Sequence, residues 1–318
     1  MFTSPAPLTD IDLPLDDRRD GKVRVSYSLP NEHRLFVTTD RLSAFDRVIA
    51  SVPYKGQVLN QLSAWWFEET RDIVANHVVS IPDPNVLIAR SAVPLTVEVV
   101  VRGYITGVTD TALWTQYAAG ARVVYGHELP DGLTKNSRLA TPIVTPTTKA
   151  DHGGHDVPLS CADVADRGLV DPELWERVQA IALVLFERGR ACGEHSGLIL
   201  ADTKYEFGLT TDGELLLIDE VHTPDSSRWW VASNYDERVA AGAEPESLDK
   251  EVVRRALADI GYTGEGPVPE LSPAVWSATT DRYIDAYERL TGNSFVPGNY
   301  PAGPRIVAAL AGLEIYQP

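Results

Sequence analysis

The sequence predicts an α+β protein with two lobes, a smaller β-rich lobe over residues 1–95 and a larger mixed lobe over residues 96–318. The chain has 318 residues, which is more than one hydrophobic core usually holds together. Alternating apolar residues dominate residues 21–52, whereas helical spacing becomes frequent further along the chain. Separate runs of strands and helices are typical of α+β lobes, and the cleft between two lobes is a common ligand site.

The N-terminal elements follow from hydrophobic periodicity. Residues 1–20 are rich in Pro and Asp and are expected to form an irregular arm. Val23, Val25 and Tyr27 alternate with polar residues and predict a strand. Residues 58–76 have the spacing of an amphipathic helix. Residues 97–101 are mostly β-branched and predict a buried strand, and a turn-rich stretch follows over residues 107–160.

The C-terminal elements carry clearer boundary signals. The helix expected over residues 172–192 begins with Asp171 as cap and Pro172 in its first turn. A hairpin follows, in which Asp212-Gly213 separates two apolar segments. Ser247 is the expected cap of a helix at about residues 247–260, and a further helix is expected over residues 272–290.

Composition limits the classes of function. The net charge of −17 argues against a nucleic-acid-binding surface, which needs a basic footprint. Cys161 and Cys192 have neither metal-ligand spacing nor the number needed for a disulfide framework, so we expect two small buried residues in a reducing compartment. No apolar run approaches the 18 residues of a membrane span, so we expect a cytoplasmic protein without a membrane partner. The oligomeric state is left open.

The most informative segment is the hairpin at residues 201–220. Asp202, Lys204 and Glu206 share one face of a strand, because side chains alternate with period two, and the turn brings Asp219 and Glu220 back toward them. Carboxylates gathered on one small sheet repel each other unless a cation lies among them, and oxygen ligands of this kind suit Mg²⁺. The alternative is a solvated hairpin with surface ion pairs. The buried run Leu215–Ile218, which leads directly into Asp219, favours the metal site.

Other polar segments are weaker signals by themselves. Gly21-Lys22-Val23-Arg24 would let the backbone approach a phosphate, although a surface lysine is the simpler interpretation. The segment at residues 39–46, which includes Ser43, reads equally well as a capped turn. Arg102, followed by Thr109 and Thr111 near glycines, suits a monophosphate because a guanidinium matches phosphate oxygens. His152 and His155 lack the partners of a zinc site.

Together these segments resemble the phosphoribosylaminoimidazole-succinocarboxamide synthase (SAICAR synthetase) family. The resemblance covers most of residues 21–260 and rests on eight motifs in the same order. They are Gly-Lys-Val-Arg (21–24), Thr-Asp-Arg-Leu-Ser-Ala-Phe-Asp (39–46), Val-Val-Arg-Gly-Tyr-Ile-Thr-Gly (100–107), Thr-Pro-Thr-Thr-Lys-Ala-Asp (145–151), His-Asp-Val-Pro-Leu-Ser (155–160), Asp-Thr-Lys-Tyr-Glu-Phe-Gly (202–208), Ile-Asp-Glu-Val-His-Thr-Pro-Asp-Ser-Ser-Arg (218–228) and Ser-Leu-Asp-Lys-Glu-Val-Val-Arg (247–254).

The resemblance implies an ATP-dependent ligase of purine biosynthesis, with ATP and Mg²⁺ as cofactors and the ATP cleft between its two lobes. Such an enzyme joins L-aspartate to carboxyaminoimidazole ribonucleotide through an acyl phosphate and releases ADP and phosphate. Carried over by motif, Gly21, Lys22 and Arg24 would lie over the ATP phosphates, while Glu206 and Asp219 would hold Mg²⁺. Lys204 and Asp202 would be catalytic, with Lys204 neutralising the reacting carboxylate. The substrate residues would be Ser43, Arg102, Thr109, Thr111, Lys149, Asp156, Arg228, Lys250 and Arg254.

Within that substrate set, Arg102 and Arg228 would bind the 5′-phosphate of the ribonucleotide, and Lys250 and Arg254 would face its carboxylate. The chain departs from the family pattern at two positions, each directly after one of the motifs. Many relatives have an acidic residue where this chain has Val25, and many have a serine where it has Val108. Thr109 or Thr111 is therefore expected to supply the missing hydroxyl at the phosphate.

Two other functions would share parts of this sequence pattern. A paralogue that couples a different amino acid or azole carboxylate would keep the same ATP and metal residues, so the sequence does not separate it from the purine enzyme. A non-catalytic nucleotide-binding regulator is disfavoured, because it predicts loss of phosphoryl-site residues that are all present here, namely Lys22, Lys204, Glu206 and Asp219.

Overall fold

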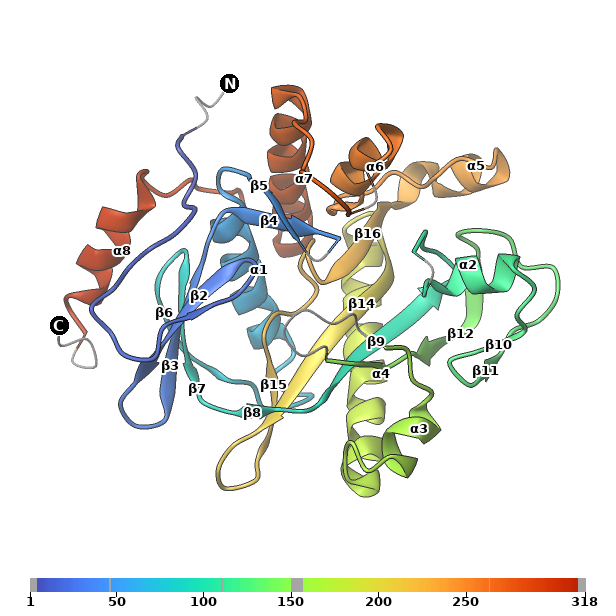
Figure 1. The fold of residues 1–318 in the computed structure, drawn as a ribbon, viewed down its shortest axis with the longest axis horizontal. Helices are drawn as coiled ribbons and strands as arrows, with labels where there is room; N and C mark the ends of the chain where they lie inside the picture. Colours follow the sequence, from blue (N-terminus) through green and yellow to red (C-terminus); the bar gives the residue numbers. More distant parts are fainter. Residues whose placement is uncertain (1–4, 46, 110, 150–156, 263, 314–318) are drawn as a thin grey trace.

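The computed structural model describes residues 5–45, 47–109, 111–149, 157–262 and 264–313, and it has an α+β fold with two main antiparallel sheets (Figure 1). The α+β prediction is therefore confirmed. The N-terminal part of the described chain is mostly strands with one helix, α1, whereas helices and strands alternate further along the chain.

The first sheet is built from the N-terminal part of the chain. Val25 and Tyr27 are fully buried in it, as the alternating pattern predicted. The C-terminal helix α8 (Ala302–Leu310) covers it, because Ala302, Ile306 and Leu310 share an apolar core with these strand residues (Figure 1). The strand order is β1 (Arg19–Asp20), β2 (Arg24–Leu29), β3 (His33–Thr38), β7 (Val86–Arg90) and β6 (Val78–Asp83).

The second sheet has β9 (Val97–Tyr104) and β14 (Leu198–Leu209) side by side at its centre. The expected strand at residues 97–101 is the first part of β9, in which Val97, Val99 and Val101 are fully buried. Residues Asp202 and Arg102 face each other across the central pair. The other strands are β8 (Val93–Pro94), β12 (Arg138–Val144), β13 (Thr147–Thr148), β15 (Leu215–Ile218) and β16 (Ser227–Val231).

Helix α4 (Pro172–His195) packs against the second sheet and has the start that the sequence predicted. The Asp171 side chain accepts hydrogen bonds from the backbone N–H groups of Glu173 and Leu174, both at 3.1 Å. Gly189 allows the close approach, because a Cβ at this position would lie 2.4 Å from Cε1 of His222. The helix therefore contacts the segment that follows β15.

Helix α1 (Lys55–Glu69) begins and ends earlier than the expected range of 58–76. It begins early because the carboxylate of Asp40 accepts a hydrogen bond from the backbone N–H of Gly56 at 2.9 Å, which satisfies a group in its first turn. It ends early because the chain turns after Thr70 so that Asn76 pairs with Leu217 of β15. Sequence spacing alone did not reveal either long-range contact.

The helix expected at residues 247–260 with Ser247 as cap is α6, which spans only Glu251–Asp259. Ser247 is not its cap. Residues 247 and 248 pair with β16 through Trp230 and Trp229, which keeps this backbone extended. Asp249 instead accepts a hydrogen bond from the backbone N–H of Glu251 at 2.7 Å. The last expected long helix is confirmed as α7 (Pro273–Thr291), which packs against α1 and α6.

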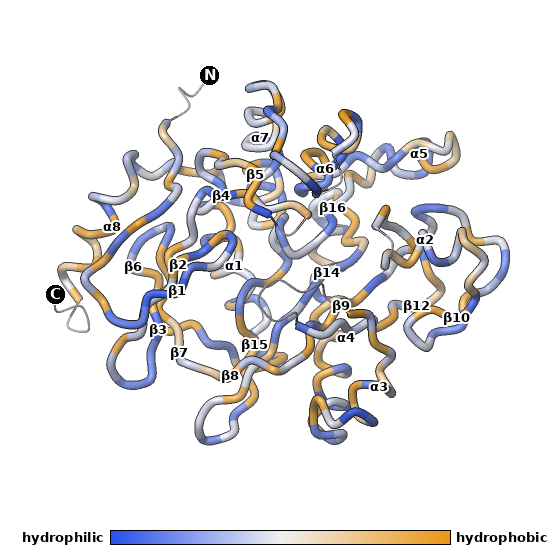
Figure 2. Tube along the Cα trace, in the orientation of Figure 1, coloured by the Kyte–Doolittle hydropathy of each residue, from blue (hydrophilic) through white to orange (hydrophobic). Residues whose placement is uncertain are grey.

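The turn-rich stretch at 107–160 contains short elements. Apolar segments lie in both sheets and in α4 and α8 (Figure 2). Cys161 and Cys192 are half-buried free thiols. Across the described ranges, no helix combines the length and apolar character of a membrane span. The remaining elements are α2 (Leu113–Ala118), β10 (Val123–Val124), β11 (His127–Glu128), α3 (Cys161–Asp166), β4 (Arg41–Ala44), β5 (Arg47–Ser51), a 3₁₀ turn (Ala232–Asn234) and α5 (Tyr235–Ala240).

Candidate active site

A cavity of about 710 Å³ gathers most of the residues that the sequence analysis singled out. It is formed by the turn between β1 and β2, the central strands β9 and β14, the segment after β15 and the start of α6. The expected residues that line it are Gly21, Lys22, Arg24, Ser43, Arg102, Thr109, Thr111, Asp202, Lys204, Asp219, Arg228, Lys250 and Arg254.

The charge of this cavity differs from that of the whole chain. Eight basic and seven acidic side chains line it among the described residues, whereas the chain has 28 Lys and Arg against 45 Asp and Glu. Basic residues are thus concentrated here on an otherwise acidic protein. Such a local reversal suits anionic ligands, because fields in a cleft are set by the side chains that line it.

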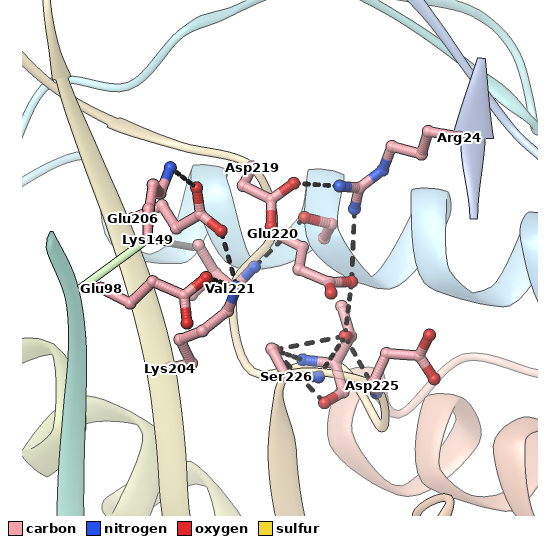
Figure 3. Close-up of polar contacts among 12 residues, drawn as sticks. Arg24, Glu98, Lys149, Lys204, Glu206, Asp219, Glu220, Val221, Asp225 and Ser226 are labelled. Atoms are coloured by element: carbon pink, nitrogen blue, oxygen red, sulfur yellow. Dashed lines mark hydrogen bonds and ion pairs between the residues drawn. The ribbon is translucent and has the colours of Figure 1, made fainter. Parts of the chain in front are cut away.

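Lys204 lies between two acids at the centre of the site (Figure 3). Its Nζ is 2.7 Å from Oε1 of Glu98 on β9 and 2.6 Å from Oε1 of Glu206 on its own strand. Burial alone would lower the pKa of Lys204, but the carboxylates of Glu206 and Glu98 more than offset it and hold that pKa well above its usual value. Lys149 contacts the other oxygen of Glu206. Lys204 is therefore a protonated cation.

The hairpin that positions these groups has the expected turn, with Gly213 at a positive φ of 85°. After β15 the chain leaves the sheet at Asp219, whose φ of 69° is in the left-handed region that Asp tolerates better than most residues. This turn directs Asp219 and Glu220 toward Arg24 of β2. The Arg24 guanidinium contacts Asp219 and lies 3.3 Å from Oε2 of Glu220 (Figure 3).

Asp202 is grouped with arginines, although we expected it beside Asp219 and Glu220. Its Oδ2 accepts a hydrogen bond from Arg102 at 3.1 Å and another from Arg228. The register explains this, because Asp202 is opposite Arg102 on β9 and Arg228 on β16, whereas Glu206 is opposite Ile218 next to Asp219. Arg102 also donates to Oγ1 of Thr145 at 2.9 Å. The two arginines expected at a phosphate are thus held together.

A third group of charges lies around Asp225, which lines the same cavity. Its carboxylate is 2.7 Å from Nζ of Lys55, a side chain with no exposed surface, and it accepts a 2.6 Å hydrogen bond from Tyr283 of α7. Burial lowers the pKa of Lys250, and the neighbouring Arg254 acts in the same direction. Lys250 and Arg254 both face the cavity, as expected.

The two other predicted substrate residues are Lys149, which does not line the large cavity, and Asp156. Lys149 lies at the site through its contact with Glu206. Asp156 and the residues His152 and His155 of the disfavoured zinc site lie outside the described residues.

A second cavity of about 500 Å³ adjoins the first and was not anticipated. Arg24, Ser26, Phe36 and Asp219 line both cavities. The second cavity also has apolar walls from Leu87, Ala92, Pro94 and Ile218, and it is bordered by the backbone that connects the two sheets after β7. Its size and apolar lining are typical of small-molecule sites.

Sequence reasoning missed several residues of the site, and some of them left a signal. Glu98 is an acid in an otherwise β-branched strand, and such a residue usually has a buried cationic partner. Asp225 belongs to the motif at residues 218–228, but its ion pair with Lys55 was not predicted. Lys55 carries no local signal, because its burial depends on α7, which is more than 200 residues further along the chain.

The residues present fit a magnesium ion that is shared with phosphates. Glu206 and Asp219 offer hard carboxylate oxygens, and both line the second cavity where it adjoins the first. Among the described residues no group of three or more potential ligands could form an all-protein metal site. Mg²⁺ usually takes one or two carboxylates and completes its shell with water and phosphate oxygens, so this donor set suits it.

The fold and the charged cavity are typical of an enzyme that acts on anionic substrates. The model of the SAICAR synthetase family matches residues 17–269, and the chain belongs to this family. The phosphoribosylaminoimidazole-succinocarboxamide synthase of Legionella pneumophila is 47% identical over 302 residues, covering 94% of this chain and 95% of that protein.

Solved structures give the same result. The SAICAR synthase of Saccharomyces cerevisiae, solved in complex with SAICAR, matches with a TM-score of 0.77 and 32% identity, covering 91% of this chain and all of that one. A type-2 SAICAR synthetase solved in complex with ADP matches in fold, with a TM-score of 0.66, 24% identity and coverage of 88% of this chain and all of that one.

Proposed function

We propose that the protein is an ATP-dependent carbon–nitrogen ligase that joins L-aspartate to carboxyaminoimidazole ribonucleotide, giving SAICAR, ADP and phosphate in purine biosynthesis. Family membership supports the activity. The observation that carries the assignment of the site is the pair of adjoining cavities with Arg24 and Asp219 in their common wall. Two phosphate-bearing substrates need separate sites whose reacting ends meet, and this arrangement supplies them.

ATP is assigned to the second cavity, with its phosphates pointing into the first. The apolar walls suit a purine base. The β1–β2 turn closes tightly, because the backbone N–H of Gly21 donates to the carbonyl of Arg24 at 2.8 Å, and this turn lines the first cavity. Gly21, Lys22 and Arg24 are then the residues over the phosphates, in a position similar to that of a strand-borne glycine-rich loop. The related structure with ADP supports nucleotide use.

The ribonucleotide is assigned to the large cavity. Arg102 and Arg228 are held together by Asp202, and Arg228 and Arg254 both lie near Glu251, so these three arginines exceed the two carboxylates and leave a positive charge for the 5′-phosphate. Thr109 and Thr111 line the same region, and their hydroxyl oxygens are 3.5 Å apart. Asp202 then acts by orienting the two arginines. Lys250 and Arg254 are assigned to the imidazole carboxylate.

Glu206 and Asp219 would hold Mg²⁺, which would offset charge on the ATP phosphates when bound. Arg24 already contacts Asp219, and Lys149 and Lys204 contact Glu206. These ion pairs orient both carboxylates.

The reaction has two steps. An oxygen of the imidazole carboxylate attacks the γ-phosphorus of ATP, so that an acyl phosphate forms and ADP leaves. The amine of L-aspartate then attacks the acyl carbon, phosphate leaves, and the nitrogen loses a proton as the amide forms. Lys204 is a half-buried cation that faces the large cavity and neutralises the carboxylate as it approaches ATP. Lys149 and Ser43 are assigned to the ribonucleotide or aspartate region, together with Asp156.

We also propose that residues 1–95 form the ATP-phosphate lobe and residues 96–318 the substrate lobe, with α8 returning from the second to the first. A cytoplasmic location stays a prediction.

The test is turnover by the purified protein with ATP, Mg²⁺, L-aspartate and carboxyaminoimidazole ribonucleotide, measured as equal amounts of ADP and SAICAR. A panel of other amino acids, and another azole carboxylate in place of the imidazole, are run in parallel. Preferred turnover of a different amino acid or azole would identify the paralogue function instead. Binding of ATP without any turnover would support the regulator and contradict the ligase.

A further inference from the structure

The feature that the proposed mechanism does not use is a tyrosine in a hairpin turn beside the large cavity. Strands β10 and β11 pair with Val124 opposite His127, so Tyr125 and Gly126 form a two-residue turn. Their φ angles are 55° and 82°, and a turn with two positive φ values normally has Asn-Gly or another small polar pair. A bulky aromatic residue with positive φ is an outlier, and such outliers gather at functional sites.

The hairpin is held firmly in place, so the unusual tyrosine is not a consequence of a loose surface loop. A Cβ on Gly126 would lie 2.9 Å from Cβ of Ser160, which shows how closely the turn packs on the start of α3. The imidazole of His127 is hydrogen-bonded to the carbonyl of Val144 at 2.7 Å. The side chain of Tyr125 therefore leaves a fixed point in a fixed direction.

The tyrosine hydroxyl reaches the region assigned to the 5′-phosphate. It donates a hydrogen bond to the backbone carbonyl of Thr111 at 2.7 Å. Burial raises the pKa of Tyr125, while the neighbouring Arg102 guanidinium acts in the opposite direction. Thr111 and Arg102 line the large cavity, whereas Tyr125 does not.

We propose that Tyr125 is a positioning residue for the 5′-phosphate: its hydroxyl fixes the backbone at Thr111, so that the Thr111 hydroxyl and the Arg102 guanidinium, which line the same cavity, face the phosphate together. This inference rests on the proposed placement of the ribonucleotide. It also gives a physical reason why a chain with Val108 after Gly107 can still hold its phosphate segment in place.

The decisive variant is Tyr125→Phe, which removes one hydroxyl and keeps the ring. Losing one neutral hydrogen bond corresponds to roughly a two- to twelvefold change in affinity. We expect the KM for the ribonucleotide to rise by that factor, with kcat and the KM for ATP unchanged. The same variant should leave kcat/KM unchanged for the nucleoside form of the substrate, which lacks the 5′-phosphate.

Tyr117→Phe is the matched control. The Tyr117 hydroxyl also bonds a backbone carbonyl, that of Pro130 at 2.8 Å, but Tyr117 lies in the apolar cluster around α2 and does not line the cavity. We expect it to lower the melting temperature and leave the KM for the ribonucleotide unchanged. An equal rise of this KM in Tyr117→Phe would overturn the proposal, because it would show general loosening of the region.

Tyr125→Asn separates positioning from folding. Asn adopts positive φ more readily than Tyr, so the turn should form at least as well and the melting temperature should not fall. The KM for the ribonucleotide should still rise, because the shorter side chain does not reach Thr111. If part of the Tyr125→Asn protein failed to fold, the apparent kcat would fall but KM would not change. The KM therefore reports on positioning whether or not the variant folds fully. An unchanged KM in Tyr125→Phe or Tyr125→Asn, with an active wild type, overturns the role of Tyr125; an inactive wild type counts against the proposed function instead.

Discussion

Glu98 and Glu206 share one lysine across two neighbouring strands: Nζ of Lys204 is 2.7 Å from Oε1 of Glu98 and 2.6 Å from Oε1 of Glu206. The three side chains come from β9 and β14 and project toward the junction of the two cavities. Because both acids accept from the same ammonium, the position of its charge is fixed from two sides. A fixed charge is useful in catalysis, since little reorganisation is needed when the substrate arrives.

Replacing Lys204 by Arg should therefore abolish most activity although the charge is retained. The planar guanidinium is larger and donates in a fixed fork, so it cannot occupy the same point between two carboxylates. We expect kcat to fall by at least about 100-fold, the range that the loss of one charge-stabilising group usually produces. Lys135→Arg is the control, because Lys135 pairs with Glu244 away from the cavity. Near-normal kcat in Lys204→Arg would show that the lysine is only a structural ion-pair partner.

Asp219→Asn should raise the Mg²⁺ concentration needed for half-maximal activity, because one of the two carboxylates assigned to the metal loses its charge. Glu206→Gln should have the same direction of effect. The measurement is a magnesium titration at saturating ATP, with Asp212→Asn as control, since Asp212 lies in the turn of the same hairpin and is exposed. Wild-type magnesium dependence in both Asp219→Asn and Glu206→Gln would show that these two carboxylates do not hold the metal.

Local patterns in the sequence predicted the elements that are determined by local chemistry. The cap at Asp171, the Asp-Gly turn and the buried strand at residues 97–101 each depend on neighbouring residues, and the structure confirms them. The limits of α1 and α6 were wrong because contacts with Asp40, Leu217 and Trp230 decide them. Such contacts join residues far apart in the chain, and periodicity carries no information about them.

The candidate site shows the same division. Motifs brought the right residue types to attention, and most of them line one cavity. The sequence did not predict which of these residues pair with each other. Asp202 was expected near Asp219, but the strand register places it between Arg102 and Arg228. The second cavity was missed, because its apolar and polar wall residues come from separate segments of the chain and form a site only when these segments meet.

The free energy of unfolding should fall as pH decreases from 7 to 5. Burial lowers the pKa of both His77 and His222 to about 3, whereas an unfolded histidine titrates near 6.5. Below about pH 6.5 the unfolded chain therefore binds protons that the folded chain does not, and stability is lost by roughly 1.4 kcal/mol per pH unit for each group.

Asp249 acts in the opposite direction within this range. Burial raises the pKa of Asp249 to about 6, so the folded state binds its proton first and gains stability as pH falls below that value. Urea unfolding at pH 7, 6 and 5 measures the net slope, and His77→Gln should reduce it, because one of the two histidines no longer titrates. A slope identical to that of the wild type would contradict the assignment to His77.

Arg102→Ala should weaken ribonucleotide binding without a comparable effect on ATP. Removing a charge-assisted contact costs roughly 1.5–3 kcal/mol, which corresponds to about a ten- to hundredfold rise in the KM for the ribonucleotide. Thr109→Val and Thr111→Val remove neutral hydroxyls and should each cost less, roughly 0.5–1.5 kcal/mol. Arg122→Ala is the control, because Arg122 is an exposed arginine that pairs with Asp131 and does not line the cavity.

If Arg102→Ala changed the KM for ATP and left that for the ribonucleotide unchanged, the phosphate would have to be placed elsewhere. If neither threonine variant had an effect, backbone N–H groups after Gly107 would be the remaining donors, since the φ of 106° at Gly107 already turns this segment beside the Arg228 guanidinium.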